Sequence, residues 1–249
     1  MESFGQQLLP SLYVVSWLGM TTPRLDCHVY VLRGSDGLLL VDCGTPWGYP
    51  RIVENMAHWG LRIEDVRTIL LTHAHVDHVS GGGLFKRHGA EILCHREIAS
   101  AVECQWETAL GKDGDPTSWR IDGTLGDGDR IGRCDFAVEV LATPGHTRGC
   151  LSFLIAVDGQ RCLFTGDLIM SNAWPGWHGD PGYCEADIVA SLRRLCGVGF
   201  RHLCHGHDAL LEDGGALFHK ALAAYDSGAW DAPGSPLRVP VGGRHRAAP

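Results

Sequence analysis

Four side chains that can bind metal occur within six consecutive positions of the chain. They are His73, His75, Asp77 and His78, in the pattern His-x-His-x-Asp-His. Neutral imidazole nitrogens and carboxylate oxygens are common ligands of divalent ions. Alternate side chains of a turn that leaves a strand can point the same way, so His73 and His75 can bind one ion. Asp77 and His78 follow where the chain enters a helix, and their different direction suits a second ion close to the first. The motif therefore predicts a reaction that depends on two neighbouring metal ions.

Further ligands are predicted where three downstream apolar runs end in sharp turns. Residues 136–142 read as a strand and are followed by a turn that carries His146. The runs 162–165 and 200–204 end in Gly166-Asp167 and in His205-Gly206-His207. Each segment repeats the order of strand, turn and candidate ligand, which would present these side chains at strand ends.

The elements that must position these residues can be predicted from periodicity and from turn residues. The predicted strands near the N-terminus are residues 12–17, 28–33, 38–41 and 66–71. A hairpin turn at 35–37 joins the second and third of these strands. Residues 50–59 have helical spacing, with Pro50 in the first turn and Gly60 at the end. A second helix is expected at 185–195, so the pattern indicates an α/β protein.

The order of the motifs resembles that of the metallo-β-lactamase superfamily, whose signature runs His-x-His-x-Asp-His, Gly-His, Gly-Asp and a late Gly-His. The resemblance extends from Leu12 to about Tyr225 and includes Asp42, which looks like the family's strand-ending Asp-x-Gly. It implies an αββα four-layer sandwich of two mixed β-sheets flanked by helices. In that fold, the strand-end turns of both halves lie along one edge.

The resemblance also implies a ligand set, carried over position by position. These ligands are His73, His75 and His146 for a first metal, Asp77, His78 and His207 for a second, and Asp167 as a bridge between them. His207 is preferred to His205 because it follows Gly206, as in the family motif. Asp42 is expected either to orient a ligand loop by hydrogen bonds or to cap a turn.

Two Zn²⁺ ions, or Fe or Mn in their place, would lower the pKa of a bridging water toward neutrality. The predicted reaction is hydrolysis of an ester, thioester or lactone by this hydroxide, with Asp77 as the catalytic residue that orients it and accepts its proton. Met170 stands where related lactonases often have tyrosine, which weakens the lactone interpretation. A second reaction stays open, because persulfide dioxygenases look similar but hold one iron at the positions of His73, His146 and Asp167. A β-lactamase and a metal-bound scaffold without turnover are the remaining alternatives.

Length and composition favour one globular domain. The chain has 249 residues, of which 45% are hydrophobic and 20% charged. We expect a single domain over residues 1–230 and a disordered tail over 231–249, which is rich in Pro and Gly. The segments 105–120 and 171–184 are predicted loops. The second carries Trp174, Trp177, His178 and Tyr183, and it could cover an apolar substrate or cap the edge of the sandwich.

Charge and cysteine usage predict the partners and the compartment. The net charge is −8 without a long basic run, which is evidence against nucleic acid as a partner. No apolar run approaches the ~20 residues needed to cross a membrane, and no signal peptide is recognised. Ten cysteines without Cys-x-x-Cys pairs indicate reduced thiols in a cytoplasmic protein, with Cys43 and Cys204 as buried apolar residues. The expected partner is a small-molecule substrate, and the aromatic residues are compatible with a homodimer.

Overall fold

The computed structural model of the chain describes residues 4–23, 25–103, 120–207, 214–232, 235 and 237. Within them, the first sheet has the strand order β1-β2-β3-β4-β5-β6-β7. Its strands are β1 (Gln6–Leu9), β2 (Leu12–Ser16), β3 (Val29–Arg33), β4 (Leu38–Val41), β5 (Val66–Leu70), β6 (Glu91–His95) and β7 (Gly123–Leu125). The second sheet has the order β12-β11-β10-β9-β8. Its strands are β8 (Arg130–Arg133), β9 (Phe136–Ala142), β10 (Leu151–Val157), β11 (Gln160–Gly166) and β12 (His202–His205).

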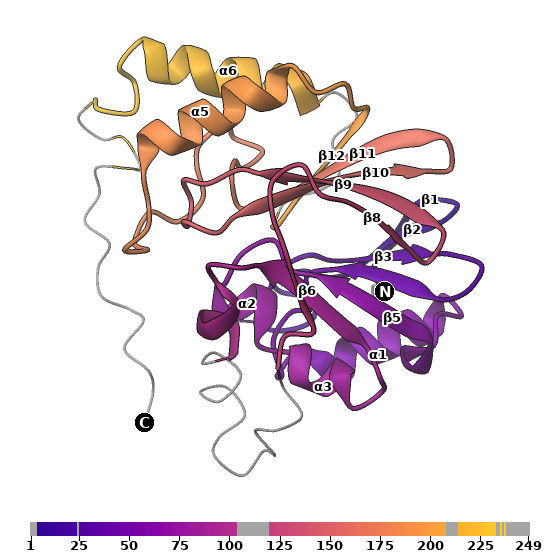
Figure 1. Cartoon of the computed structure of the whole chain (residues 1–249). Helices are drawn as coiled ribbons and strands as arrows, with labels where there is room; N and C mark the ends of the chain where they lie inside the picture. The colour runs from indigo at the N-terminus through magenta and orange to yellow at the C-terminus, as the bar shows by residue number, and fades with distance from the viewer. Residues whose placement is uncertain are drawn as a thin grey trace, which may run out of the picture.

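The two sheets face each other and helices cover their outer faces (Figure 1). The helices beside the first sheet are α1 (Tyr49–His58), α2 (Val76–Val79) and α3 (Gly82–Lys86), together with the short 3₁₀ turn η1 (Ile63–Asp65). The second sheet is covered by α5 (Glu185–Cys196) and α6 (Gly214–Asp226). Both sheets are mixed, because antiparallel pairs are joined by the parallel pairs β4–β5 and β11–β12. The predicted αββα sandwich is therefore confirmed.

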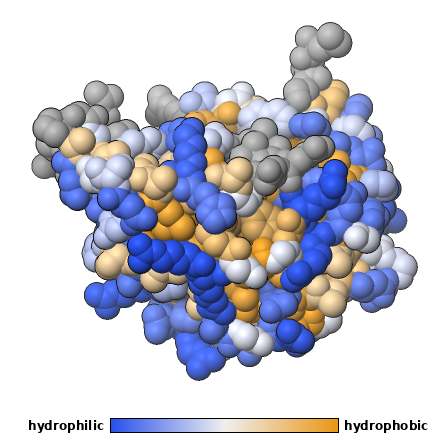
Figure 2. All heavy atoms as spheres, turned by 90° about the horizontal axis from the view of Figure 1, so that it is seen from above, coloured by the Kyte–Doolittle hydropathy of each residue, from blue (hydrophilic) through white to orange (hydrophobic). Residues whose placement is uncertain are grey.

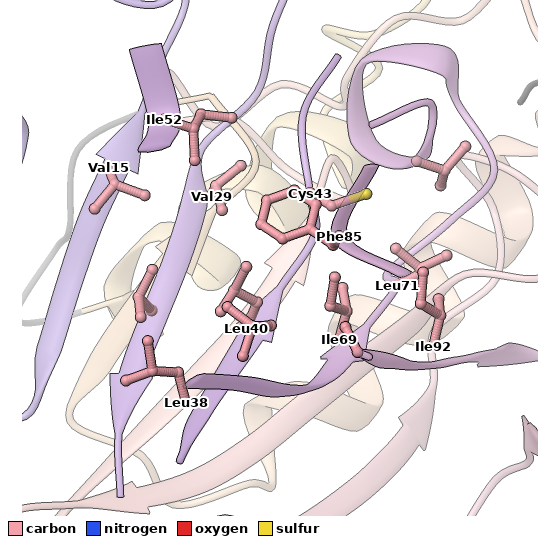
Figure 3. Packing of buried hydrophobic residues seen from close by; sticks show 14 of the residues in the cluster. Val15, Val29, Leu38, Leu40, Cys43, Ile52, Ile69, Leu71, Phe85 and Ile92 are labelled. Carbon is pink, nitrogen blue, oxygen red and sulfur yellow. The ribbon is translucent and has the colours of Figure 1, made fainter. Parts of the chain in front are cut away.

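Three apolar clusters fill the spaces between these layers. Along β3, Val29 and Val31 pack toward the helices, whereas Tyr30 and Leu32 pack between the sheets. Successive side chains of a strand point to opposite faces, so a strand that is buried on both faces needs a continuous apolar run. Figure 3 shows the cluster on the helix side of the first sheet, where Phe85 of α3 lies against side chains from several strands. Burying a side chain of this size stabilises the fold by about 1.5–3 kcal/mol.

The outer helices keep one apolar face inward. In α5, Ile188, Leu192 and Leu195 are buried, whereas Arg193 and Arg194 are exposed. The face of the molecule on the α5 and α6 side shows hydrophilic residues around a central apolar area (Figure 2). This mixture is normal for a protein surface, so the face alone indicates no partner.

The carboxyl ends of the central strands meet at one edge. Because β4 and β5 are parallel, the turns after Val41 and Leu70 lie side by side. The same holds for the turns after β11 and β12. Two backbone hydrogen bonds join the sheets at this edge: Leu151 N–H donates to Thr72 O (2.8 Å), and His28 N–H donates to Gly206 O (2.6 Å). The strand-end motifs of the two halves are thereby brought together.

Most predicted elements occur with small shifts at their ends. Residues 38–41 and 136–142 form β4 and β9 with the predicted bounds. The predicted strand at 28–33 begins one residue later, because the backbone N–H of His28 bonds to Gly206 instead of a neighbouring strand. The run 200–204 is strand from His202 to His205. The predicted helices correspond to α1, which starts one residue before Pro50, and to α5.

Some predictions fall on residues outside the described part of the chain. Of the predicted loop 105–120, Arg120 is described, and of the predicted tail 231–249, residues 231, 232, 235 and 237 are described. Leu237 is buried in the cluster beneath α5 and α6. The boundary of the domain at residue 230 stays a prediction. In the described residues, no helix is both long and apolar enough to span a bilayer.

Candidate metal centre

The seven predicted ligands come from strand ends of both sheets and lie together. His73 and His75 follow β5, and α2 carries Asp77 and His78. His146, Asp167 and His207 follow β9, β11 and β12. Their ligand atoms form two groups, each with all atoms within 4.8 Å of one another. The first group is His73, His75, His146 and Asp167, and the second is Asp77, His78 and His207.

The first group is a compact set of imidazoles. His75 Nδ1 lies 3.1 Å from His73 Nε2 and 2.9 Å from His146 Nε2. His73 and His146 are fully buried, and the side chain of His75 is 17% exposed. Asp167 Oδ2 lies 3.6 Å from His146 Nε2, which adds a negative charge beside the three rings.

Asp167 of the first group also contacts residues of the second group. His207 Nε2 lies 3.3 Å from Asp77 Oδ2 and 3.2 Å from Asp167 Oδ2. His78 Nε2 lies 3.3 Å from Asp167 Oδ1. Asp167 thus contacts histidines of both groups, which is the position that a bridging carboxylate requires.

Asp42 supports both groups from behind. Its Oδ1 accepts the backbone N–H of Thr72 (2.8 Å), and its Oδ2 accepts the Thr72 hydroxyl (2.8 Å) and His78 Nδ1–H (2.7 Å). The Thr72 hydroxyl in turn accepts His73 Nδ1–H (3.0 Å). Asp42 also has a positive φ of 60°, a conformation that costs energy for a residue other than glycine. Of the two roles predicted for Asp42, the contacts support orientation of the ligand loop.

Hydrogen bonds on the side of each ring away from the centre determine which imidazole nitrogen of His73 and His75 carries the proton. Because the Thr72 hydroxyl donates to Asp42, His73 must donate from Nδ1, and its Nε2 carries a lone pair. His75 donates from Nε2 to Asp180 Oδ2 (3.2 Å), so its Nδ1 carries a lone pair as well. Two lone pairs 3.1 Å apart repel each other unless a cation lies between them. This arrangement fits a metal ion.

Two buried atoms of the groups have no hydrogen-bond partner within the described residues. They are His146 Nδ1 and Asp167 Oδ1, although Asp167 Oδ1 has an ion-pair contact with His78 Nε2 at 3.3 Å. A buried carboxylate oxygen without a hydrogen bond is costly, and a divalent ion would satisfy it. The residues present therefore fit a metal centre at both groups.

The charges of the side chains match what metal ligands need. Burial lowers the pKa of His146 to about 4 and that of His73 well below its usual value, so both imidazoles are neutral. Burial raises the pKa of Asp167, but His207 and His78 outweigh it and hold this carboxyl ionised. Burial lowers the pKa of His207, and the contacts with Asp167 and Asp77 reverse this and raise it to about 10. A metal ion in the second group would replace protons that balance these carboxylates.

The turn after β12 brings His207 rather than His205 to the site. A Cβ atom on Gly206 would lie 2.0 Å from Asp167 Oδ1, so glycine alone allows this close approach. The side chain of His205 is buried, its Nδ1 lies 2.8 Å from Ile169 O, and it belongs to neither group. The choice of His207 from the Gly-His pattern agrees with this placement.

The predicted aromatic loop is divided between the site and the core. The ring of Trp177 lies 5.4 Å from that of His75, and its side chain is one of the exposed large hydrophobics, at 40%. Trp174 instead packs against Trp230, with ring centroids 6.3 Å apart. Trp177 could thus cover a substrate, whereas Trp174 caps the layer of the sandwich beneath α5 and α6.

Sequence reasoning missed Thr72, Asp180 and Cys27. Thr72 directly precedes the motif, which is a local signal, but Asp180 contacts His75 across 105 residues and no spacing rule indicates it.

Cys27 forms a third cluster with Asp42 and His78. Its thiol is fully buried, burial raises its pKa, and it donates a hydrogen bond to the backbone oxygen of His28. The predicted apolar role of Cys43 and Cys204 agrees with their complete burial, and the cysteines within the described residues are all free.

Comparison with known families adds to this geometry. The model of the metallo-beta-lactamase superfamily matches residues 22–207, which include both ligand groups. The chain belongs to this superfamily.

Individual superfamily members give narrower comparisons. A hydroxyacylglutathione hydrolase of Aeromonas hydrophila is 29% identical over 181 residues, which are 72% of this chain and 60% of that protein. The mitochondrial persulfide dioxygenase ETHE1 of Mus musculus is 33% identical over 101 residues, which are 40% of this chain and 32% of that protein. The crystal structure of a metallo-beta-lactamase family protein from Thermus thermophilus has a TM-score of 0.69 and 27% identity, and covers 89% of this chain and 81% of its own. The present superfamily member therefore spans about three fifths of the hydrolase it matches.

Proposed function

We propose that this protein is a dinuclear metal-dependent hydrolase that cleaves a thioester or a related ester or lactone. His73, His75 and His146 would hold the first ion, and Asp77, His78 and His207 the second. The observation that carries the proposal is the position of Asp167, which contacts histidines of both groups. Zinc is the expected metal because imidazole and carboxylate ligands in a compact site suit it.

A thioester is the leading substrate class within this proposal. The hydrolase from Aeromonas hydrophila is named for hydroxyacylglutathione, whose acyl group is joined to a sulfur atom. Met170, at the position where related lactonases often have tyrosine, gives no hydroxyl to a lactone. The thioester is therefore preferred to the lactone.

The side chains would divide the work as follows. Divalent ions held by the two groups would allow water to ionise near neutral pH and would polarise the scissile carbonyl. Asp77 Oδ2 lies 3.3 Å from His207 Nε2 at the second group, where this carboxylate can orient the attacking water and hold its proton. Trp177 would cover the side of the site at His75 and limit the access of bulk water.

The first test is metal content by elemental mass spectrometry on protein purified without added metal, followed by hydrolysis assays with matched thioester, ester and lactone substrates. About two zinc ions per chain and preferred thioester cleavage are expected. The variant His146→Asn should lose metal and activity, whereas His88→Asn, an exposed histidine outside both groups, should retain them. About one iron per chain, with oxygen consumed in the presence of a persulfide, would instead support a dioxygenase that uses His73, His146 and Asp167. The similarity to ETHE1 is the reason for testing this second function.

The remaining expectations accompany this proposal without adding to it. A small-molecule substrate, the absence of nucleic-acid and membrane partners, a homodimer and a cytoplasmic location stay predictions from the sequence.

A further inference from the structure

His75 differs from the other histidines of its group in the nitrogen that faces inward. His73 and His146 approach the centre with Nε2, whereas His75 approaches with Nδ1. A half-turn of the His75 ring about its Cβ–Cγ bond would place Cδ2 where Nδ1 lies and Cε1 where Nε2 lies, so something must select the observed orientation. The contact on the outer side is the carboxylate of Asp180, whose Oδ2 lies 3.2 Å from His75 Nε2.

Asp180 is itself held in place by its own turn. Its Oδ1 accepts the backbone N–H of Gly182 at 2.6 Å. Gly182 packs so closely on Arg148 that an added Cβ atom would lie 2.9 Å from Arg148 Cγ. The carboxylate is 24% exposed, so it is partly shielded from water. A fixed and partly shielded acceptor can orient an imidazole more effectively than a mobile surface carboxylate.

The same loop touches other members of the first group. Gly176 N–H donates to the backbone oxygen of Asp167 at 3.2 Å. A Cβ atom on Gly176 would lie 3.2 Å from His146 Cε1, so the loop backbone lies directly on that ring. Trp177 packs on His75, with the ring centroids 5.4 Å apart. Residues 176–182 therefore contact the first group from one side.

We propose that Asp180 is a positioning residue: it turns His75 so that Nδ1 faces the first metal ion, and it fastens the loop of residues 176–182 over that ion. The inference rests on the proposed function, because it assumes that the two groups bind metal ions. What it adds is that Asp180 supports the first group and not the second. Binding of an ion to the first group is then coupled to the position of Trp177, because both involve His75. The second group has no contact with Asp180 among the hydrogen bonds and ion pairs of the described residues.

The test measures metal affinity rather than activity alone. Zn²⁺ is titrated against a chelator into metal-depleted wild-type protein and into Asp180→Ala, Asp180→Asn and Asp187→Asn. Asp187 is exposed in the first turn of α5 and belongs to neither group, so its variant is the matched control. We expect Asp180→Ala to weaken one of the two bound ions by about 10- to 100-fold and to leave the other unchanged. Asp180→Asn should fall between, because its amide oxygen can still accept the His75 hydrogen bond.

The fluorescence of Trp177 provides a second readout. It is obtained as the difference between proteins with and without Trp177→Phe. This signal should change when the first ion binds, and the change should be much smaller in Asp180→Ala. Circular dichroism of the metal-depleted variants verifies that each is folded.

The outcomes separate this inference from the proposed function. If wild-type protein binds two ions and hydrolyses a thioester, but Asp180→Ala binds both ions as tightly as Asp187→Asn does, the inference is wrong and the function stands. If Asp180→Ala selectively weakens one ion although no ester, thioester or lactone is cleaved, the function is wrong and the positioning role stands. Equal weakening of both ions would also overturn the inference, because Asp180 would then support the whole site.

Discussion

Imidazoles make up most of the first ligand group, whereas the second pairs imidazoles with the carboxylate of Asp77. His73 and His146 are neutral because burial lowers their pKa values. In the second group, Asp77 and Asp167 raise the pKa of His207 to about 10 against the effect of burial. His73 and His146 can therefore bind a cation without releasing protons, whereas His207 must release a proton to bind one.

The two groups also differ in how the protein supports them. In the first, the outer nitrogens of His73 and His75 bond to Thr72 and Asp180. In the second, the turn that carries His207 is held by β3 of the opposite sheet, because Tyr30 Oη–H donates to His205 O (2.8 Å). The second group therefore depends more directly on the packing of the two sheets.

The largest effect is expected from the residue that the groups share. Asp167→Asn removes one charged oxygen from contacts with both groups, so both ions should bind more weakly. We expect the loss of at least one ion per chain and a fall in kcat/KM of more than about 100-fold, since loss of an outer partner alone costs 10- to 100-fold. Elemental analysis and thioester hydrolysis measure both effects, with Asp187→Asn as the control. Retention of two ions by Asp167→Asn would contradict the bridging role.

Asp42 gives the next largest effect, because it acts on both groups without touching a metal. Asp42→Asn weakens the acceptor of the Thr72 hydroxyl, which orients His73 in the first group, and the acceptor of His78 in the second group. We expect about 10- to 100-fold weaker binding of both ions and a loss of about 1–3 kcal/mol in the free energy of unfolding, as buried donors lose their acceptor. Zinc titration and urea unfolding of the metal-depleted protein provide the two measurements. Weaker binding confined to the second ion would mean that the Thr72 connection to His73 is unimportant.

A smaller effect, limited to the second group, is expected from Tyr30→Phe. The variant removes the hydroxyl that donates to His205 O and leaves a phenyl ring of nearly the same shape. Loss of one such hydrogen bond costs about 0.5–1.5 kcal/mol, so one ion should bind a few-fold to about 10-fold more weakly. Tyr13→Phe, on the neighbouring strand β2, is the control, because it removes a tyrosine hydroxyl that donates to Pro10 O, and it should change the binding of neither ion. If the two variants behave alike, the turn of His207 does not depend on Tyr30.

Most of the candidate ligands could be located from the sequence because they follow an apolar run, whereas their division between two ions was implied by the resemblance to the superfamily. Strands that are buried on both faces read as continuous apolar segments, so the ends of β4 and β11 can be located from the sequence. The ordered motifs after these runs then indicated one shared edge. The supporting residues could not be predicted, because Asp180 reaches His75 across 105 residues and Tyr30 reaches His205 across 175. Such contacts depend on how the layers pack, and spacing along the chain does not contain them.

Short edge strands escaped prediction for a different reason. β1 and β8 have half-exposed or exposed residues and lack a continuous apolar run. They form because a neighbouring strand offers hydrogen bonds, as in the pairing of β8 with β9. Local propensity is weak at such edges, so tertiary pairing decides the structure.

The smallest expected effect on the two groups comes from Asp26, a carboxylate that supports the loop after β4. Asp26 is buried and accepts hydrogen bonds from the Thr21 hydroxyl and from the backbone N–H groups of Cys27 and Thr45. Burial raises its pKa from 3.8 to about 6, and the hydrogen bonds offset only part of this rise. The folded state thus holds this proton more tightly than the unfolded state does.

The sign of the resulting pH dependence follows from linkage. Below about pH 4 the carboxyl is neutral in both states, and its stabilising contribution is lost as the pH rises through about 6. At 1.36 kcal/mol per pKa unit, the loss reaches about 3 kcal/mol near pH 7. Asp26→Asn stays neutral throughout, so its stability relative to wild type should increase by about that amount between pH 4 and pH 7. An altered hydrogen bond to Thr21 adds an offset that does not depend on pH, so the slope rather than the absolute difference tests the prediction.

Urea unfolding of the metal-depleted proteins at several pH values measures this slope. The ligand histidines titrate in both proteins, so their effect on stability cancels in the difference. Parallel stability curves for wild type and Asp26→Asn would show that the pKa of Asp26 is the same in the folded and unfolded states, contrary to the effect of its burial. A converging difference toward acid pH would assign this part of the pH dependence to the loop after β4. The pH dependence of stability that remains in both proteins would then belong to the two ligand groups. It would measure how the neutral histidines differ from the carboxylate-paired histidine, without the contribution of Asp26.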